Sequence, residues 1–420
     1  MSEPLHVNGS HRPNGSAPLD GPAPLNGSAP LNGSARPAGS PRLRAAVVLG
    51  TRPEAVKLAP VVRALDASPH FEPVLVNTGQ HREMLEPMLH RLHLTARHSL
   101  DVMRDRQQLS ALTARLVDGL GEVLRHEEPD LVIVQGDTSS TLCGALAAFY
   151  ERIPVAHVEA GLRSGVLDDP FPEELNRRLV STMTRWHFAP TERAAHRLRA
   201  EGVPPDAVHV TGNTVIDNLL WVRRRHVGRS AFRTGRRGVL VTLHRRENQG
   251  DRMRMMAATL QRLARRGDVE ILLPVHRSPA VRDVLESALG HEPHVTLTGP
   301  LDYFDFTASL AACELVLTDS GGVQEEAPSL DKPVLVLRTT TERPEVVTAG
   351  AARLVGVEPD AIHAAANALL DDPADYQGMA AAPSPFGDGY AARRIVERLT
   401  QDCVGPLPHQ LQPDVSLVDW

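Results

Sequence analysis

Acidic side chains follow short apolar segments at two places in the first half of this 420-residue chain. Asp137 comes after LVIVQG at 131–136, and Glu159 comes directly after VAHV at 155–158. Both segments have the length and composition of buried strands, and open α/β sheets bind ligands at the carboxyl ends of their strands. Two carboxylates at one sheet edge can serve a bound substrate as general acid and general base.

A third acid lies close behind them in the sequence. Glu173 stands in PFPEELNRR at 170–178, where a proline-rich turn leads into a predicted helix that also carries Glu174 and Arg177. On its own, Glu173 or Glu174 is more simply explained as a helix-start acid that complements the helix dipole. Three acidic groups that converge on one sheet edge favour a catalytic role.

The second half carries a tight glycine turn, DSGG at 319–322, between an apolar run and a predicted helix. Unpaired backbone N–H groups at a helix start attract phosphate. Glu325 and Glu326 follow one turn later, where one carboxylate could accept both hydroxyls of a ribose. Arg343, beyond the next apolar run, could pair with a phosphate or with an acid across a cleft. The alternative is an ordinary strand-to-helix turn whose acids only complement the dipole.

Cationic side chains flank the same predicted edges. Arg52 and Lys57 follow the apolar segment LRAAVVL, and His244 and His276 end two apolar runs of the second half. Of the 45 basic residues only Lys57 and Lys332 are lysine, which favours a specific need for a compact ammonium group at these positions. A single histidine at a strand end is usually structural, but two on one predicted edge favour a functional role.

Apolar segments and helix-like segments alternate through both halves of the chain. This pattern predicts an α/β fold of two doubly wound, parallel-sheet (Rossmann-like) domains that face each other across a cleft. The expected divisions are a disordered tail at 1–42, an N-terminal domain at 43–215 with the acid/base residues, a linker at 216–237, a C-terminal domain at 238–384, a helix at 385–402 and a loose tail at 403–420.

The composition argues against several classes of partner. A net charge of −6 gives no reason to expect nucleic acid or an anionic membrane surface, and no apolar run is long enough to span a bilayer. The basic run at 223–237 lacks interleaved aromatic residues, so we interpret it as a linker or exposed helix. Cys143, Cys313 and Cys403 lack metal-ligand spacing, so we expect no metal and reduced thiols of a cytoplasmic protein.

Nine strings between residues 43 and 400 closely resemble the non-hydrolysing UDP-N-acetylglucosamine 2-epimerases. In order they are GTRPEAVKLAP, QHREML, QGDTSSTL, HVEAGLRSG, PFPEELNR, VTGNTVID, HRREN, DSGGVQEEAPSLDKPVLVLRTTTERPE and PFGDG. Nine ordered matches are far more specific than a single glycine loop. The resemblance implies a two-domain fold of the GT-B glycosyltransferase type, a C-terminal helix that crosses back onto the first domain, no cofactor, and a homodimer.

The resemblance also implies a reaction, the interconversion of UDP-N-acetylglucosamine and UDP-N-acetylmannosamine. The proton on carbon 2 of the sugar is thought to leave together with UDP on carbon 1 by anti elimination, which gives a 2-acetamidoglucal. Reprotonation from the opposite face and re-addition of UDP then invert carbon 2. This needs one proton-transfer group on each face and cations at the leaving UDP. By resemblance the acid/base candidates are Asp137, Glu159 and Glu173, and His244, Lys57 and Arg52 would assist the leaving phosphate.

By the same resemblance the second domain binds UDP. The matching residues, from diphosphate to ribose to uracil, are Ser320, Gly321 and Gly322, then Glu326, then Phe306, with Arg343 in the same pocket. Some relatives bind a second UDP-N-acetylglucosamine as an activator, and Gln80, Arg245 and His276 match the positions implicated there.

Other activities are compatible with the same fold. A hydrolysing relative would let water trap the intermediate and release N-acetylmannosamine with UDP. A GT-B glycosyltransferase would move the sugar to an acceptor, although simple transfer does not need acids at Asp137, Glu159 and Glu173 together. A non-catalytic nucleotide-sugar sensor is disfavoured because the proposed acids and both lysines are intact.

Overall fold

A computed structural model describes residues 42–80, 82–104, 107–276 and 278–405. The predicted N-terminal tail lies outside the described residues except for Arg42, and the predicted C-terminal tail lies outside them beyond residue 405. Within the described ranges, no helix combines the length and apolar character needed to cross a membrane.

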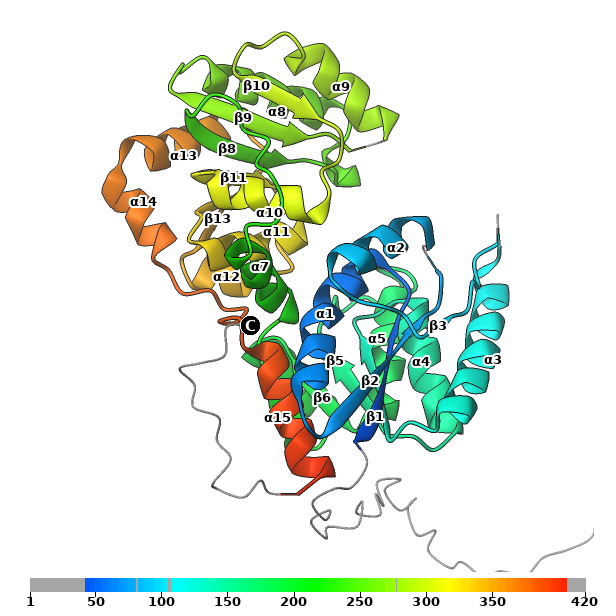
Figure 1. The fold of residues 1–420 in the computed structure, drawn as a ribbon. Helices are drawn as coiled ribbons and strands as arrows, with labels where there is room; N and C mark the ends of the chain where they lie inside the picture. The colour runs from blue at the N-terminus through cyan, green and yellow to red at the C-terminus, as the bar shows by residue number, and fades with distance from the viewer. Residues whose placement is uncertain (1–41, 81, 105–106, 277, 406–420) are drawn as a thin grey trace, which may run out of the picture.

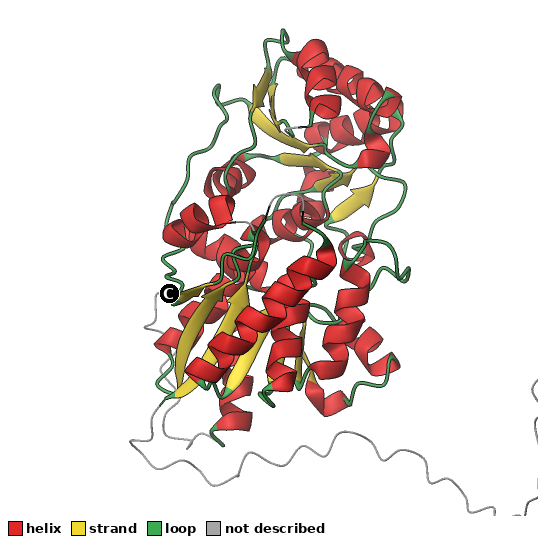
Figure 2. Cartoon of the chain, turned by 90° about the vertical axis from the view of Figure 1, so that its right-hand side faces the viewer, coloured by secondary structure: helices red, strands yellow, loops and turns green. Residues whose placement is uncertain are grey.

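The chain forms two lobes, each a parallel sheet with helices packed on it (Figures 1 and 2). This confirms the predicted α/β fold. The strand order is β3-β2-β1-β4-β5-β6-β7 in the first lobe and β10-β9-β8-β11-β12-β13 in the second. β4 and β11 are buried at every residue, which explains why they read as continuous apolar runs rather than alternating ones.

The first lobe contains seven strands and the helices between them. The strands are β1 (Leu43–Leu49), β2 (Phe71–Asn77), β3 (His98–Ser99), β4 (Leu131–Gln135), β5 (Val155–Val158), β6 (Trp186–Ala189) and β7 (Val208–Val210). The helices are α1 (Arg52–Ala67), α2 (Arg82–Arg91), α3 (Leu109–Glu127), α4 (Ser139–Tyr150), α5 (Glu173–Met183) and α6 (Glu192–Ala200), with a 3₁₀ turn, η1, at Pro205–Ala207.

The second lobe repeats the alternation with six strands. They are β8 (Arg237–Thr242), β9 (Val269–Pro274), β10 (Val295–Thr298), β11 (Leu315–Thr318), β12 (Val334–Val336) and β13 (Ala352–Leu354). The helices are α8 (Asp251–Ala264), α9 (Pro279–Leu289), α10 (Tyr303–Ala312), α11 (Gly321–Glu326), α12 (Pro344–Thr348), α13 (Pro359–Asp371) and α14 (Pro373–Ala380), with 3₁₀ turns η2 (Arg246–Asn248) and η3 (Ala327–Leu330).

Each sheet has one point where the strand order reverses. The chain adds β2 and β3 on one side of β1 and then returns to place β4 on the other side, and it does the same around β8 and β11. Open α/β sheets bind ligands in the crevice at such a reversal, outside the carboxyl ends of the strands. Asp137 follows β4 and Ser320 follows β11, so the fold places predicted site residues at both reversal points.

Two stretches of chain join the lobes and touch each other. α7 (Thr214–Arg224) leads out of the first lobe, and α15 (Ala391–Cys403) returns to pack against α1 and α7 (Figure 1). Residues 216–224 of the predicted linker therefore belong to a packed helix. A Cβ on Gly212, whose φ is +92°, would lie 3.2 Å from the Cα of Gly387, so only glycine permits this close crossing.

Candidate functional site

A cavity of ≈ 180 Å³ opens at the reversal point of the first sheet. It is lined by Thr51, Pro53, Glu54, Lys57, Gln135, Gly136, Asp137, Thr138, Glu159, Leu162 and Arg177. The fold therefore brings Lys57, Asp137 and Glu159 together, as the sequence predicted. Glu173 and Arg52, which are both partly buried, are not among the described side chains that line this cavity.

One wall of the cavity is held by Glu54, which the sequence analysis did not single out. Its carboxylate accepts hydrogen bonds from the backbone N–H groups of Gly50 (2.9 Å) and Thr51 (2.7 Å) and from the hydroxyls of Thr138 (2.6 Å) and Thr141 (3.1 Å). Burial raises the pKa of Glu54, and these hydrogen bonds oppose the rise. Glu54 thus fixes the start of α1 against the start of α4.

Glu159 is the second buried glutamate that lines the cavity. It follows β5 with a φ of +64°, a left-handed conformation that is rare for a side chain of this kind and is typical of functional sites. The Lys57 ammonium lies 2.6 and 2.7 Å from its two oxygens, and the Gln135 amide also donates to it. Burial alone would raise the pKa of Glu159, but Lys57 and Arg343 outweigh burial and lower it. Glu159 is therefore held as a carboxylate.

Asp137 meets a different environment. The Arg177 guanidinium lies 2.5 Å from one of its oxygens, and the Asn176 amide donates to its backbone carbonyl at 2.8 Å. Burial raises the pKa of Asp137, Arg177 opposes the rise, and the charge of Glu159 adds to it, so that the net shift is upward. Two carboxylates of one cavity whose pKa values move in opposite directions fit an acid and a base.

The acid of α5 that faces inward is Glu174 rather than Glu173. Glu174 is fully buried and binds Arg177 (3.1 Å), Arg178 (3.3 Å) and the backbone N–H of Ser164 (2.9 Å). It holds Arg177 against Asp137. Glu173, the first residue of α5, is partly exposed.

In the second lobe, buried Asp319 organises the turn after β8. It accepts hydrogen bonds from the backbone N–H groups of His244 and Arg245 (both 3.0 Å) and from the Asn248 amide (3.0 Å), and it contacts Nδ1 of His244 at 3.1 Å. The contact orients the His244 ring and leaves Nε2 for a ligand. The sequence analysis placed Asp319 only within the DSGG turn and did not predict that it orients His244.

The glycine turn after β11 lies beside two cations. A Cβ placed on Gly321 would stand 3.7 Å from the Arg245 guanidinium and 3.9 Å from that of Arg343, whereas one on Gly322 would meet nothing within 4 Å. Burial raises the pKa of Glu326 to about 8, and the neighbouring charge of Glu325 adds to this effect. The turn therefore combines backbone N–H groups with two guanidinium groups, and Glu326 follows at the other end of α11.

Three further predicted residues, Phe306, His276 and Gln80, lie on separate elements of the two lobes. Phe306 on α10 packs partly buried against the core. The His276 ring stacks on that of His244 with centroids 6.3 Å apart, and Gln80 accepts a hydrogen bond from the Ser140 hydroxyl at 2.9 Å. A shared effector role for Gln80, Arg245 and His276 stays a prediction. In the part of the chain that the structure describes, no group of three His, Cys, Asp or Glu side chains is placed to hold a metal ion.

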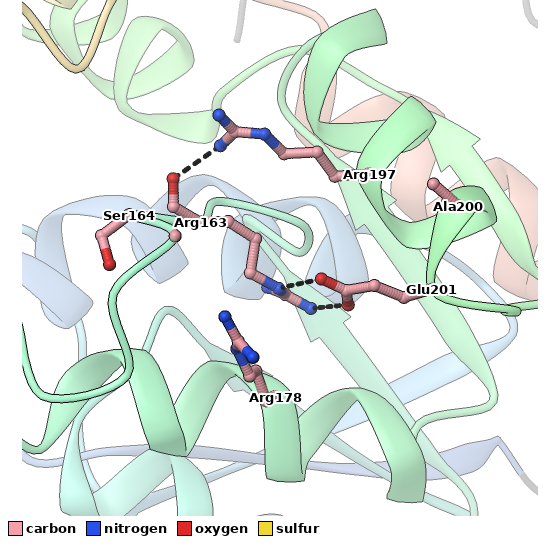
Figure 3. A pocket seen from close by; sticks show the side chains of 7 residues that line it. Arg163, Ser164, Arg178, Arg197, Ala200 and Glu201 are labelled. Atoms are coloured by element: carbon pink, nitrogen blue, oxygen red, sulfur yellow. Dashed lines mark hydrogen bonds and ion pairs between the residues drawn. The ribbon is translucent and has the colours of Figure 1, made fainter.

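A second cavity of ≈ 250 Å³ lies beside α5 and α6 (Figure 3). The Arg163 guanidinium lies in it but is paired with Glu201 at 2.7 and 2.9 Å. Arg197 donates to the backbone carbonyl of Arg163 at 2.6 Å. These arginines hold the loop after β5 against α6.

Comparisons with known proteins agree with this arrangement. A protein from Ralstonia solanacearum called "Probable UDP-N-acetylglucosamine 2-epimerase" is 48% identical over 368 residues, which are 85% of this chain and 98% of that protein. A putative UDP-N-acetylglucosamine 2-epimerase from Listeria monocytogenes has a crystal structure that matches with a TM-score of 0.80 at 40% identity, over 86% of this chain and 96% of that one. The UDP-GlcNAc 2-epimerase from Neisseria meningitidis, solved bound to UDP-GlcNAc, matches with a TM-score of 0.77 at 40% identity, over 86% and 100% of the two chains.

The match extends across both lobes. The family model for UDP-N-acetylglucosamine 2-epimerase covers residues 63–400, from within α1 to within α15. With the residues of both reversal points in place, the chain belongs to the UDP-N-acetylglucosamine 2-epimerase family.

Proposed function

We propose that this chain interconverts UDP-N-acetylglucosamine and UDP-N-acetylmannosamine without net hydrolysis, by elimination and re-addition of UDP. The observation that carries the proposal is the pair Glu159 and Asp137, which share one cavity with Lys57. Their pKa values are shifted in opposite directions. Inversion of carbon 2 through a glucal requires a base on one face of the sugar and an acid on the other, and such a pair can supply both.

The nucleotide would bind to the second lobe. Ser320, Gly321 and Gly322 would hold the diphosphate beside the guanidinium groups of Arg245 and Arg343. Nε2 of His244, with Lys57 and Arg52 from the first lobe, would stabilise the charge that develops on the leaving UDP. Glu326 would bind the ribose hydroxyls, and Phe306 would lie near the uracil. These assignments follow the family resemblance together with the placement of the two arginines.

Turnover in deuterium oxide tests the reaction. We expect the purified enzyme, given UDP-N-acetylglucosamine, to form UDP-N-acetylmannosamine that carries deuterium at carbon 2, because the abstracted proton exchanges with solvent before the other face is protonated. Mass spectrometry of the separated nucleotide sugars measures this. Product that keeps protium at carbon 2 would exclude the elimination mechanism.

The same samples separate epimerisation from hydrolysis. A hydrolysing enzyme would accumulate free N-acetylmannosamine and UDP, whereas we expect an equilibrium mixture of two UDP-sugars. We place the reaction in the cytoplasm, in keeping with the unpaired thiols of Cys143, Cys313 and Cys403.

We also propose that the enzyme acts as a homodimer through α4 and α5. These helices pack together and expose Phe149, Tyr150, Leu175 and Leu179, four large apolar side chains that a monomer would leave in water. We expect Phe149→Asp to convert a dimer into a monomer, as measured by light scattering after size-exclusion chromatography. Tyr390→Asp, which alters an exposed aromatic side chain outside α4 and α5, serves as the control. A monomeric parent protein, or a dimeric Phe149→Asp variant, would contradict this interface.

A further inference from the structure

Asn213 stands where the two lobes meet and touches a carboxylate of each. Its Nδ2 donates to Oε1 of Glu159 at 3.3 Å and to Oε2 of Glu325 at 2.9 Å, and the two hydrogens of one amide suffice for both bonds. Glu159 belongs to the first lobe, and Glu325 lies on α11 of the second. We propose that Asn213 is a positioning residue that couples the orientation and ionisation of Glu159 to the closure of the lobes. This inference rests on the proposed function.

Both chain crossings between the lobes hold the Asn213 amide in place. Its Oδ1 accepts the backbone N–H of Val215 at the start of α7 (3.2 Å). Its own backbone N–H donates to the carbonyl of Phe386 on the returning crossing (2.7 Å). The Gly212–Gly387 contact lies next to it in both stretches of chain. The pivot of any lobe rotation therefore passes close to Asn213, which stays beside Glu159 while Glu325 moves with the second lobe.

The Asn213 amide separates two partly buried ion pairs. Lys57 binds Glu159 on one side, and Arg343 binds Glu325 on the other. Without a neutral donor between them, two carboxylates would face each other, and each would raise the pKa of its neighbour. Asn213 satisfies both and carries no charge of its own.

The titratable and charged groups that face Glu159 come from several elements of both lobes. They are Lys57 on α1, Asp137 after β4, His157 on β5, Glu325 on α11 and Arg343 before α12. Only Glu325 and Arg343 belong to the second lobe, and Asn213 is the described side chain that bonds to both Glu159 and Glu325. Opening the lobes would remove the Arg343 charge from Glu159 and leave only the Lys57 charge to offset its burial, so closure of the nucleotide-binding lobe favours the ionised form of Glu159.

Two substitutions test this role because serine and aspartate both preserve the helix-start function of Asn213. Asn213→Ser replaces the two amide hydrogens by one hydroxyl hydrogen on a shorter side chain, which cannot bind both carboxylates, and we expect kcat to fall by about tenfold, the effect of losing one hydrogen bond to a charged group. Asn213→Asp places a third carboxylate there, and we expect the acidic limb of the pH profile of kcat to move upward by about one unit or more. Both changes should alter kcat more than KM.

Asn218→Ser is the matched control, because Asn218 is a buried amide on the same helix that binds Arg63 rather than Glu159. We expect it to lower thermal stability and to leave the pH profile unchanged. If Asn213→Ser behaved in the same way, with the acidic limb at its original pH, Asn213 would be only structural and the inference would be wrong.

A measurement that does not depend on turnover separates this inference from the proposed function. Carbon-13 NMR of labelled glutamate carboxyl groups can follow the titration of Glu159, assigned by the signal lost in Glu159→Gln. We expect the titration to move upward in Asn213→Asp. An unmoved titration would overturn the role of Asn213, whereas an enzyme that fails to turn over UDP-N-acetylglucosamine would contradict only the proposed reaction.

Discussion

Glu159→Gln is expected to lower kcat by on the order of 100-fold or more, since glutamine keeps the shape of the side chain but cannot accept a proton. The substitution also removes the negative charge that Lys57 and Asn213 contact. KM should change less than kcat, because the proposed nucleotide contacts lie in the second lobe. Initial rates of UDP-N-acetylmannosamine formation at saturating substrate measure the effect.

Glu270→Gln provides the comparison for this variant. Glu270 is a buried glutamate that accepts hydrogen bonds from Arg233 and Thr234 near the amino end of β9, the opposite end of that strand from the proposed site. We expect it to lower the melting temperature and to leave kcat within about twofold, because surface and remote changes act through stability alone. Equal losses of kcat in both variants would mean that Glu159 has no special part in the chemistry.

Acid titration gives a second signature of Glu159. Its pKa in the folded enzyme lies below the ordinary 4.5, so its ionised form contributes stability that is present at neutral pH and is lost as the pH falls through the folded value. Glu159→Gln lacks this contribution. The difference in melting temperature between the parent enzyme and the variant should therefore shrink as the pH is lowered below about 4.5.

The sequence was sufficient for those parts of the site that one lobe builds by itself. Asp137 and Glu159 end neighbouring strands of one sheet, and Lys57 lies on the helix after the strand next to them. Because parallel strands end at the same edge, their order along the chain was enough to place the three together. The DSGG turn was predictable for the same reason.

The parts that depend on lobe orientation were not predictable. Asn213 meets Glu325 across 112 residues, and no local pattern encodes how the two sheets face each other. Which of the two acids at the start of α5 is buried also escaped the sequence, because it depends on the residue at which α5 begins; the catalytic role of Glu173 stays a prediction. A shift of one residue in a helix turns a side chain by about 100°, which exchanges the buried acid for the partly buried one.

Asp137→Asn and Glu159→Gln are expected to show reciprocal solvent exchange in deuterium oxide, beyond a loss of epimerisation of on the order of 100-fold or more. If the two carboxylates act on opposite faces of the sugar, each variant keeps one functional face. That face can still remove the proton from carbon 2 of one epimer and return a deuteron to the same side. One variant should therefore label UDP-N-acetylglucosamine without epimerising it, and the other should label only UDP-N-acetylmannosamine.

Each variant is incubated with each UDP-sugar, and proton NMR then reports the deuterium content of carbon 2. The four results together show which carboxylate acts on which face of the sugar. Deuterium in the same epimer for both variants would place Asp137 and Glu159 on one side of the sugar and would contradict their assignment to opposite faces.

Glu173→Gln is the informative third variant, since Glu173 does not line the cavity but remains an acid/base candidate by resemblance. If Glu173→Gln rather than Asp137→Asn were the reciprocal of Glu159→Gln, the second face would belong to Glu173. The raised pKa of Asp137 would then reflect only its burial and the neighbouring charge of Glu159.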